Sequence, residues 1–134
     1  MIVVDTNIIA YLIINGEFTS QAERVLEKDP RWASPTLWQS ELSNILTGCV
    51  RRGFVTLSKA QELMNFALDV IGRGTIDVSP NAVLNLAAHS ACSSYDCEFV
   101  ALAQSLGIPL VTNDKQILKE FPGIAVSLED FLNR

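Results

Sequence analysis

The sequence predicts an α/β domain in which a mostly parallel β-sheet is sandwiched between helices. Short apolar runs of strand character alternate with longer stretches of helical periodicity along the 134 residues. Hydrophobic residues make up 49% of the chain and charged residues only 19%, a composition that excludes a disordered protein. No repeat, low-complexity segment or linker interrupts the alternation, so we expect a single domain over residues 1–134.

The first half of the chain is predicted to form two strands and four helices. Ser34 and Pro35 are expected as N-cap and first residue of the third helix, which Gly53 ends, and Ser58 with Gln61 as a capping box for the fourth. The expected strands are Ile2–Val4 and, more weakly, Arg31–Ala33, and the expected helices are Thr6–Ile14, Ser20–Lys28, Pro35–Arg52 and Ser58–Gly72.

The second half continues the alternation with three strands and four helices. Ser79 and Pro80 repeat the cap-and-proline signal, Gly107 ends the next helix, and Ser127 caps the last. The expected strands are Thr75–Val78, Leu110–Thr112 and Ile124–Val126, and the expected helices are Pro80–Ala91, Tyr95–Leu106, Lys115–Glu120 and Leu128–Leu132. Ligands of such sheets bind outside the carboxyl ends of the strands, so residues at those ends are candidates for a site.

Four acidic residues stand where a solvent-exposed charge is not expected. Asp5 directly follows the first strand and Asp114 follows the fourth, while Glu41 and Asp96 interrupt the apolar stripes of their helices. A charge on a buried stripe is costly unless it has a partner, a metal ion or a wet cleft. One acidic cleft at the carboxyl edge of the sheet would explain all four residues.

Each of these acids also has a structural explanation. Asp5 and Asp96 are both suited to cap a helix, Glu41 could pair with an arginine, and Asp114 could lie in a turn with Asn113. The remaining helical acids fit polar faces and are expected on the solvated surface; among them are Glu23, Glu27, Glu62, Asp69 and Glu98.

A carboxylate cluster without neighbouring His or Cys ligands indicates a hard cation such as Mg²⁺ or Mn²⁺. One ion, or two ions about 4 Å apart, could activate a water and stabilise the leaving oxygen of a phosphodiester. Helix N-termini beside Asp5 and Asp96 would favour the ionised acids and could receive phosphate oxygens.

The charge balance restricts the partners. With 10 basic and 15 acidic residues the formal net charge is −5, so a polyanionic substrate would need bound cations, or else the partners are basic.

The longest apolar run near the start, Ile8–Ile14, is too short to cross a bilayer, and we expect a cytoplasmic protein. The three cysteines are expected to be buried thiols.

Four short segments together resemble the PIN-domain ribonucleases, most closely the VapC-type toxins of toxin–antitoxin pairs. The matching segments are Ile2-Val3-Val4-Asp5-Thr6-Asn7, Ser34-Pro35 leading to Glu41-Leu42, Ser94-Tyr95-Asp96, and Leu110-Val111-Thr112-Asn113-Asp114-Lys115. The resemblance implies a three-layer α/β/α sandwich with a mostly parallel five-stranded sheet. It also implies a Mg²⁺- or Mn²⁺-dependent endoribonuclease.

The resemblance further implies a site and partners. Asp5, Glu41, Asp96 and Asp114 match the family's four acids, and Thr6, Asn7, Thr112 and Asn113 match supporting positions beside them. Asp5 and Asp96 would be the main metal ligands, while the other two acids complete the site or orient the attacking water. The expected partners are an RNA substrate, a small cognate antitoxin that can place a basic side chain against the acidic pocket, and a second copy in a homodimer.

Other functions remain open on the sequence alone. A stand-alone RNA-processing nuclease would carry the same site. A non-catalytic module that binds Mg²⁺ or a protein would tolerate loss of some of the acids, yet all four are present. A phosphorelay receiver needs an acceptor at the end of a central strand, whereas Asp77 is expected inside its strand. A haloacid-dehalogenase-type phosphatase needs an Asp at the position of Asn7.

Four more residues carry weaker expectations. Trp38 is expected either in the core or in a partner groove. His89 is expected to be structural or on the surface, Lys115 either to touch phosphate or to pair with an acid, and Phe66 to be a core aromatic.

Overall fold

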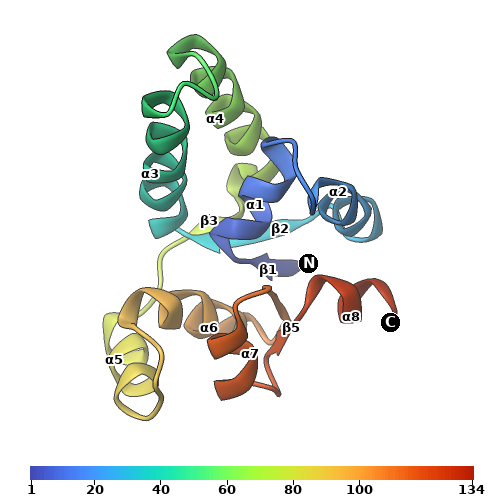
Figure 1. Cartoon of the computed structure of the whole chain (residues 1–134). Helices are drawn as coiled ribbons and strands as arrows, with labels where there is room; N and C mark the ends of the chain where they lie inside the picture. The colour runs from blue at the N-terminus through green and yellow to red at the C-terminus, as the bar shows by residue number, and fades with distance from the viewer.

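The computed structural model describes all residues, 1–134, and confirms a five-stranded parallel sheet between two layers of helices (Figure 1). The strand order is β3-β2-β1-β4-β5, and every neighbouring pair is parallel. The strands are β1 (Ile2–Val4), β2 (Trp32–Pro35), β3 (Thr75–Ile76), β4 (Leu110–Val111) and β5 (Ala125–Val126).

Eight α-helices surround the sheet. They are α1 (Thr6–Ile13), α2 (Thr19–Lys28), α3 (Leu37–Arg51), α4 (Leu57–Ile71), α5 (Pro80–Ala88), α6 (Ser94–Leu106), α7 (Lys115–Glu120) and α8 (Leu128–Leu132), with one 3₁₀ turn, η1 (Gly72–Gly74). In Figure 1, α1, α3 and α4 lie on one side of the sheet and α5, α6 and α7 on the other. None of the helices is both long and apolar enough to cross a membrane.

The predicted start of α3 is wrong. Ser34 and Pro35 belong to β2, where they pair with Thr75 and Ile76 of β3, and the helix begins at Leu37. The buried hydroxyl of Ser34 donates to the carbonyl of Val4 at 2.6 Å, so it joins β2 to β1 instead of capping a helix. The strand hydrogen bonds therefore outweigh the local helix-start signal.

The predictions for the other helix caps are confirmed in two cases and wrong in one. Ser79 and Ser127 each accept the backbone N–H three residues on, as predicted, with Pro80 at the first turn of α5. The capping box at Ser58 is wrong, because Thr56 caps α4 and accepts the N–H of Lys59 at 3.1 Å.

The core is made by the three central strands and the helix faces packed on them. Every residue of β1, β2 and β4 is buried, and the three cysteines are buried and free of disulfides, as expected. Trp38 is fully buried and its indole N–H donates to Thr75 Oγ1 at 2.9 Å, so it is a core residue. Phe66 is 47% exposed, so its assignment to the core is wrong.

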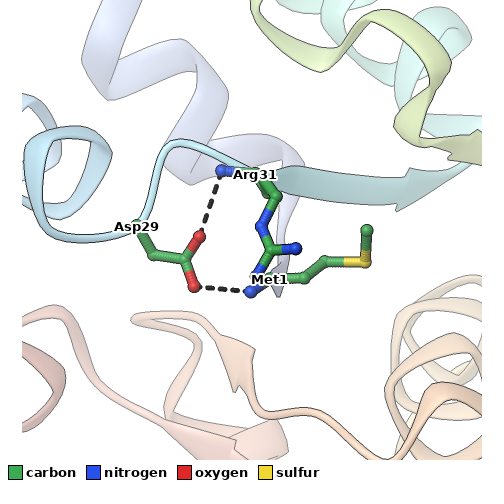
Figure 2. A network of polar contacts seen from close by, with 3 residues as sticks. All are labelled: Met1, Asp29 and Arg31. Atoms are coloured by element: carbon green, nitrogen blue, oxygen red, sulfur yellow. Dashed lines mark hydrogen bonds and ion pairs between the residues drawn. The ribbon is translucent and has the colours of Figure 1, made fainter.

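A polar network joins the amino ends of β1 and β2 (Figure 2). The Asp29 carboxylate accepts from the N-terminal amine of Met1 at 2.6 Å and from the backbone N–H of Arg31 at 3.1 Å. Together with the bond from the Ile2 N–H to the Arg31 carbonyl, these contacts support the register that pairs Ile2 with Trp32. The opposite, carboxyl ends of β1 and β4 carry Asp5 and Asp114.

Candidate active site

The four acids that the sequence singles out line one cleft at the carboxyl edge of the sheet. Asp5 follows β1, Asp114 follows β4, Glu41 comes from α3, and Asp96 comes from the first turn of α6. The cleft has a volume of about 220 Å³, and the other residues that line it are Thr6, Asn7, Asn44, Ile45 and Phe99. Elements far apart in the sequence thus bring together all four predicted positions.

Asp5 is the most buried and most restrained of the acids. It caps α1 by accepting the Asn7 N–H on Oδ1 at 3.2 Å, and Oδ2 accepts the Thr112 hydroxyl at 2.6 Å. Burial raises its pKa, and the charge of Asp114 adds to this, although the two hydrogen bonds act in the opposite direction. The cap and the cleft were alternatives for Asp5 on the sequence, and the structure shows that it does both.

Glu41 has no arginine partner, so that alternative is wrong. Its Oε1 accepts the Thr6 hydroxyl at 2.8 Å, and neither of the two ion pairs in the structure includes it. Its pKa is raised, first by burial and then by the charges of Asp5, Asp96 and Glu98, while the Thr6 bond lowers it.

Asp96 is not a helix cap either, because Ser93 caps α6 and accepts the Asp96 N–H at 3.1 Å. Burial raises the pKa of Asp96, followed by the charges of Asp114 and Asp5. Asp114 caps the short helix α7, with Oδ1 accepting the Ile117 N–H at 2.9 Å.

Three of the four supporting residues contact the acids. Thr6 and Asn7 bond Glu41 and Asp5, and Thr112 joins two acids, because its hydroxyl donates to Asp5 and accepts the N–H of Asp114 at 3.0 Å. Asn113 does not line the cleft; its side-chain oxygen accepts the Leu128 N–H at 3.2 Å and so ties β4 to α8.

Sequence reasoning missed two polar residues. Asn44 lines the cleft three residues after Glu41, a spacing that places both on one face of α3. Glu98 was expected on the solvated surface, but it is half-buried, and burial raises its pKa. For Asn44, the helical spacing from Glu41 was a usable signal.

Three other polar residues lie outside the cleft. His89 is exposed at the end of α5, where its Nδ1 lies 2.7 Å from the Asn85 carbonyl. Lys115 is exposed and forms no ion pair, so of its two alternatives the pairing with an acid is wrong. Asp77 lies after β3 rather than inside it, and it accepts the Thr36 hydroxyl at 2.7 Å at the edge of the sheet, far from a receiver-like central position.

The donor chemistry of the cleft fits a hydrated hard cation. No Lys, Arg or His lines it, and both ion pairs of the structure lie elsewhere, so the four carboxylates have no cationic partner. No three acidic, His or Cys side chains converge closely enough to enclose one ion. Mg²⁺ typically keeps several waters and takes only one or two protein carboxylates together with substrate phosphate. The cleft therefore fits an open site of that kind and does not fit a closed cage.

The raised pKa values predict a pH dependence of stability. A carboxyl whose pKa is higher in the folded than in the unfolded chain contributes stability below the unfolded pKa of about 4, and this is lost as the pH rises through the folded pKa. Because Asp5, Glu41 and Asp96 all shift this way, metal-free protein should melt at lower temperature at pH 7.5 than at pH 5. Thermal melts in EDTA at the two pH values measure this difference in melting temperature. Asp5→Asn should show a smaller difference than wild type. An equal difference in the two proteins would contradict the prediction.

Comparison with known proteins identifies the family. Residues 2–123 match the model of the PIN domain. The chain belongs to the PIN domain family. This PIN domain is of the VapC type: it is 31% identical over 127 residues to ribonuclease VapC3 of Pyrobaculum aerophilum, an alignment that covers 92% of the chain and 96% of that relative. The resemblance proposed from the four sequence segments is confirmed.

Solved structures agree with the fold. PAE2754 from Pyrobaculum aerophilum superposes with a TM-score of 0.79 at 24% identity, covering 99% of this PIN domain and 94% of that chain. A toxin–antitoxin complex from Klebsiella pneumoniae gives 0.69 at 22% identity, covering 96% and 98%. FitAcB from Neisseria gonorrhoeae gives 0.70 at 13% identity, covering 95% and 96%.

Proposed function

We propose that this PIN domain is a metal-dependent endoribonuclease and the toxin of a toxin–antitoxin pair. The observation that carries the proposal is the cleft itself, in which four carboxylates from separate elements lie without a cationic partner. Membership of a family whose 31%-identical member is named a ribonuclease supports this chemistry.

The proposed metal ligands are Asp5 and Asp96, with Glu41 and Asp114 completing the site. A bound Mg²⁺ or Mn²⁺ would lower the pKa of a water and stabilise charge on the scissile phosphate. Asp5 follows β1 and Asp96 lies on α6, so the sheet and a helix would each supply a ligand to the ion, which would help to bind a substrate phosphate.

The surrounding hydrogen bonds orient the carboxylates. Thr112 and the Asn7 N–H bond both oxygens of Asp5, which fixes the plane of that carboxylate before substrate arrives. The Thr6 hydroxyl occupies Oε1 of Glu41 and leaves Oε2 free to orient the attacking water or accept its proton. The N-terminus of α6, close to Asp96, is suited to a phosphate oxygen.

An antitoxin partner is supported by the relatives and by the surface. The Klebsiella pneumoniae relative was solved as a toxin–antitoxin complex, and an acidic cleft without cations can accept a basic side chain from such a partner. Four exposed apolar residues lie on α4 and the turn before it, where Leu57 and Leu68 share one side of the helix and Phe66 lies on the other; they are Phe54, Leu57, Phe66 and Leu68. The likeness to a chain solved in a toxin–antitoxin complex favours a toxin over a stand-alone RNA-processing nuclease. A homodimer stays a prediction, which the mass of the purified protein in solution tests.

Removal of the metal should abolish cleavage. Purified protein, free of antitoxin, is incubated with structured and single-stranded RNA in Mg²⁺, Mn²⁺ or EDTA, and cutting is expected only with an ion present. In the same buffers the ion should raise the melting temperature, since an ion at 100 times its dissociation constant contributes about 2.7 kcal/mol. Cleavage that persists in EDTA would contradict the proposed metal dependence.

A further inference from the structure

A second hollow lies between the start of α5 and the start of α6. Its volume is about 390 Å³ and its walls are mainly apolar. The residues that line it are Val78, Pro80, Val83, Leu84, Ser94 and Glu98. It therefore combines an apolar wall with one carboxylate and one hydroxyl.

The first turns of α6 separate this hollow from the cleft. Ser94 and Glu98 are four residues apart and face the hollow, whereas Asp96 and Phe99, three apart, face the cleft. Tyr95 lies between these two faces of the helix and is 62% exposed. An exposed aromatic side chain thus stands at the ridge between the two depressions.

Glu98 is the acidic residue of the hollow. It lies two residues after Asp96 on the same helix, so neighbouring turns of α6 supply a carboxylate to each depression. Glu98 forms no ion pair, although it is half-buried. Its carboxylate can accept hydrogen bonds from a ligand in the hollow but cannot donate them.

We propose that this hollow is a nucleobase subsite that prefers guanine in the nucleotide beside the scissile phosphate; this rests on the proposed ribonuclease function. Single-stranded RNA is recognised by splayed bases that stack on aromatic side chains and hydrogen-bond through their edges. Leu84, which lines the hollow and is 63% exposed, supplies apolar surface, and the exposed ring of Tyr95, the residue after Ser94, supplies a stacking surface outside the lining. The Glu98 carboxylate accepts from the adjacent N1–H and N2–H₂ donors of guanine.

The same geometry disfavours uracil. The Watson–Crick edge of uracil presents one N–H between two carbonyl oxygens, so a carboxylate gains one hydrogen bond and meets two repulsive acceptors. A bidentate contact to a base contributes roughly a 10- to 100-fold preference. Because Asp96 of the cleft and Ser94 and Glu98 of the hollow come from the first turns of α6, a base can occupy the hollow while the neighbouring phosphate faces Asp96.

Nucleoside binding tests the subsite without any cleavage. Guanosine and uridine are titrated in EDTA into ¹⁵N-labelled protein, and amide shifts are followed by NMR. We expect guanosine to shift the amides of Val83, Leu84, Tyr95 and Glu98 at concentrations about tenfold below those uridine needs. The Glu98→Gln variant should lose this difference, and it should fold well because it removes a partly buried charge.

Cleavage of matched oligonucleotides tests the same preference in the active enzyme. The ratio of rates for RNAs that differ only in one guanine or uracil should fall by about tenfold in Glu98→Gln, and Glu27→Gln on exposed α2 should leave it unchanged. Equal shifts by both nucleosides, or no shifts in the hollow, would overturn the subsite. Shifts that depend on protein concentration, with a doubled mass, would instead mean that a second copy covers it. If guanosine binds as expected but wild type cuts no RNA, the ribonuclease proposal fails and the base site stands.

Discussion

Replacement of Asp5 by asparagine should lower metal-dependent RNA cleavage at least about 100-fold while the fold persists. Asn caps helices about as well as Asp, so α1 keeps its start and the Asn7 N–H keeps its acceptor. The variant loses the negative charge of a residue that is only 8% exposed, and it loses the Oδ2 atom that accepts the Thr112 hydroxyl. Burial without a cationic partner raises the pKa of this carboxyl, and a cation bound beside it would favour the ionised form.

The measurement compares initial cleavage rates and melting temperatures in Mg²⁺ and in EDTA. The matched control is Asp77→Asn, because Asp77 is exposed, hydrogen-bonded to Thr36 and outside the cleft. In EDTA near neutral pH, Asp5→Asn should melt close to wild type, because the removal of a buried carboxylate, whose pKa burial raises, offsets the loss of the hydrogen bond from the Thr112 hydroxyl. In Mg²⁺ it should lose the stabilisation that the ion gives to wild type. Full cleavage by Asp5→Asn would remove Asp5 from the proposed site.

The position of the acids could be predicted from the sequence because two simple rules apply to them. Asp5 and Asp114 directly follow apolar strands, and the carboxyl ends of parallel strands meet at one edge of the sheet. Glu41 and Asp96 stand out because each breaks an apolar helical stripe. Glu98 escaped the same rules, since its burial comes from α5 packing against α6, a contact between helices that no local pattern encodes.

The order of the strands and the ends of the helices were harder to predict. All five strands were predicted near their observed positions. The order β3-β2-β1-β4-β5 was not predicted, because the sequences of short apolar strands do not specify which strands are neighbours. Ser34 and Pro35 show why a local signal fails: they match a helix start, yet their pairing with β3 and the Ser34 bond to β1 hold them in a strand. Tertiary hydrogen bonds decide such boundaries.

Replacement of Gly74 by alanine should destabilise the protein by about 3 kcal/mol or more. Gly74 ends η1, and a Cβ built there would lie 2.0 Å from the carbonyl oxygen of Trp32, 3.0 Å from its carbonyl carbon and 3.1 Å from Ala33 Cα. These neighbours are backbone atoms of β2, so no side chain can rotate away. The clash can be relieved only by moving β3 away from β2.

That movement would also reach the cleft. Thr75, the next residue, accepts the indole N–H of the buried Trp38, which anchors the start of α3 and hence the helix that carries Glu41. Urea unfolding followed by circular dichroism measures the loss, with Gly123→Ala as the matched control because a Cβ at Gly123 meets nothing within 4 Å. We expect Gly123→Ala to stay within about 0.5 kcal/mol of wild type. If the two variants were equally stable, the prediction would be wrong: β3 could then move away from β2 at little cost in free energy.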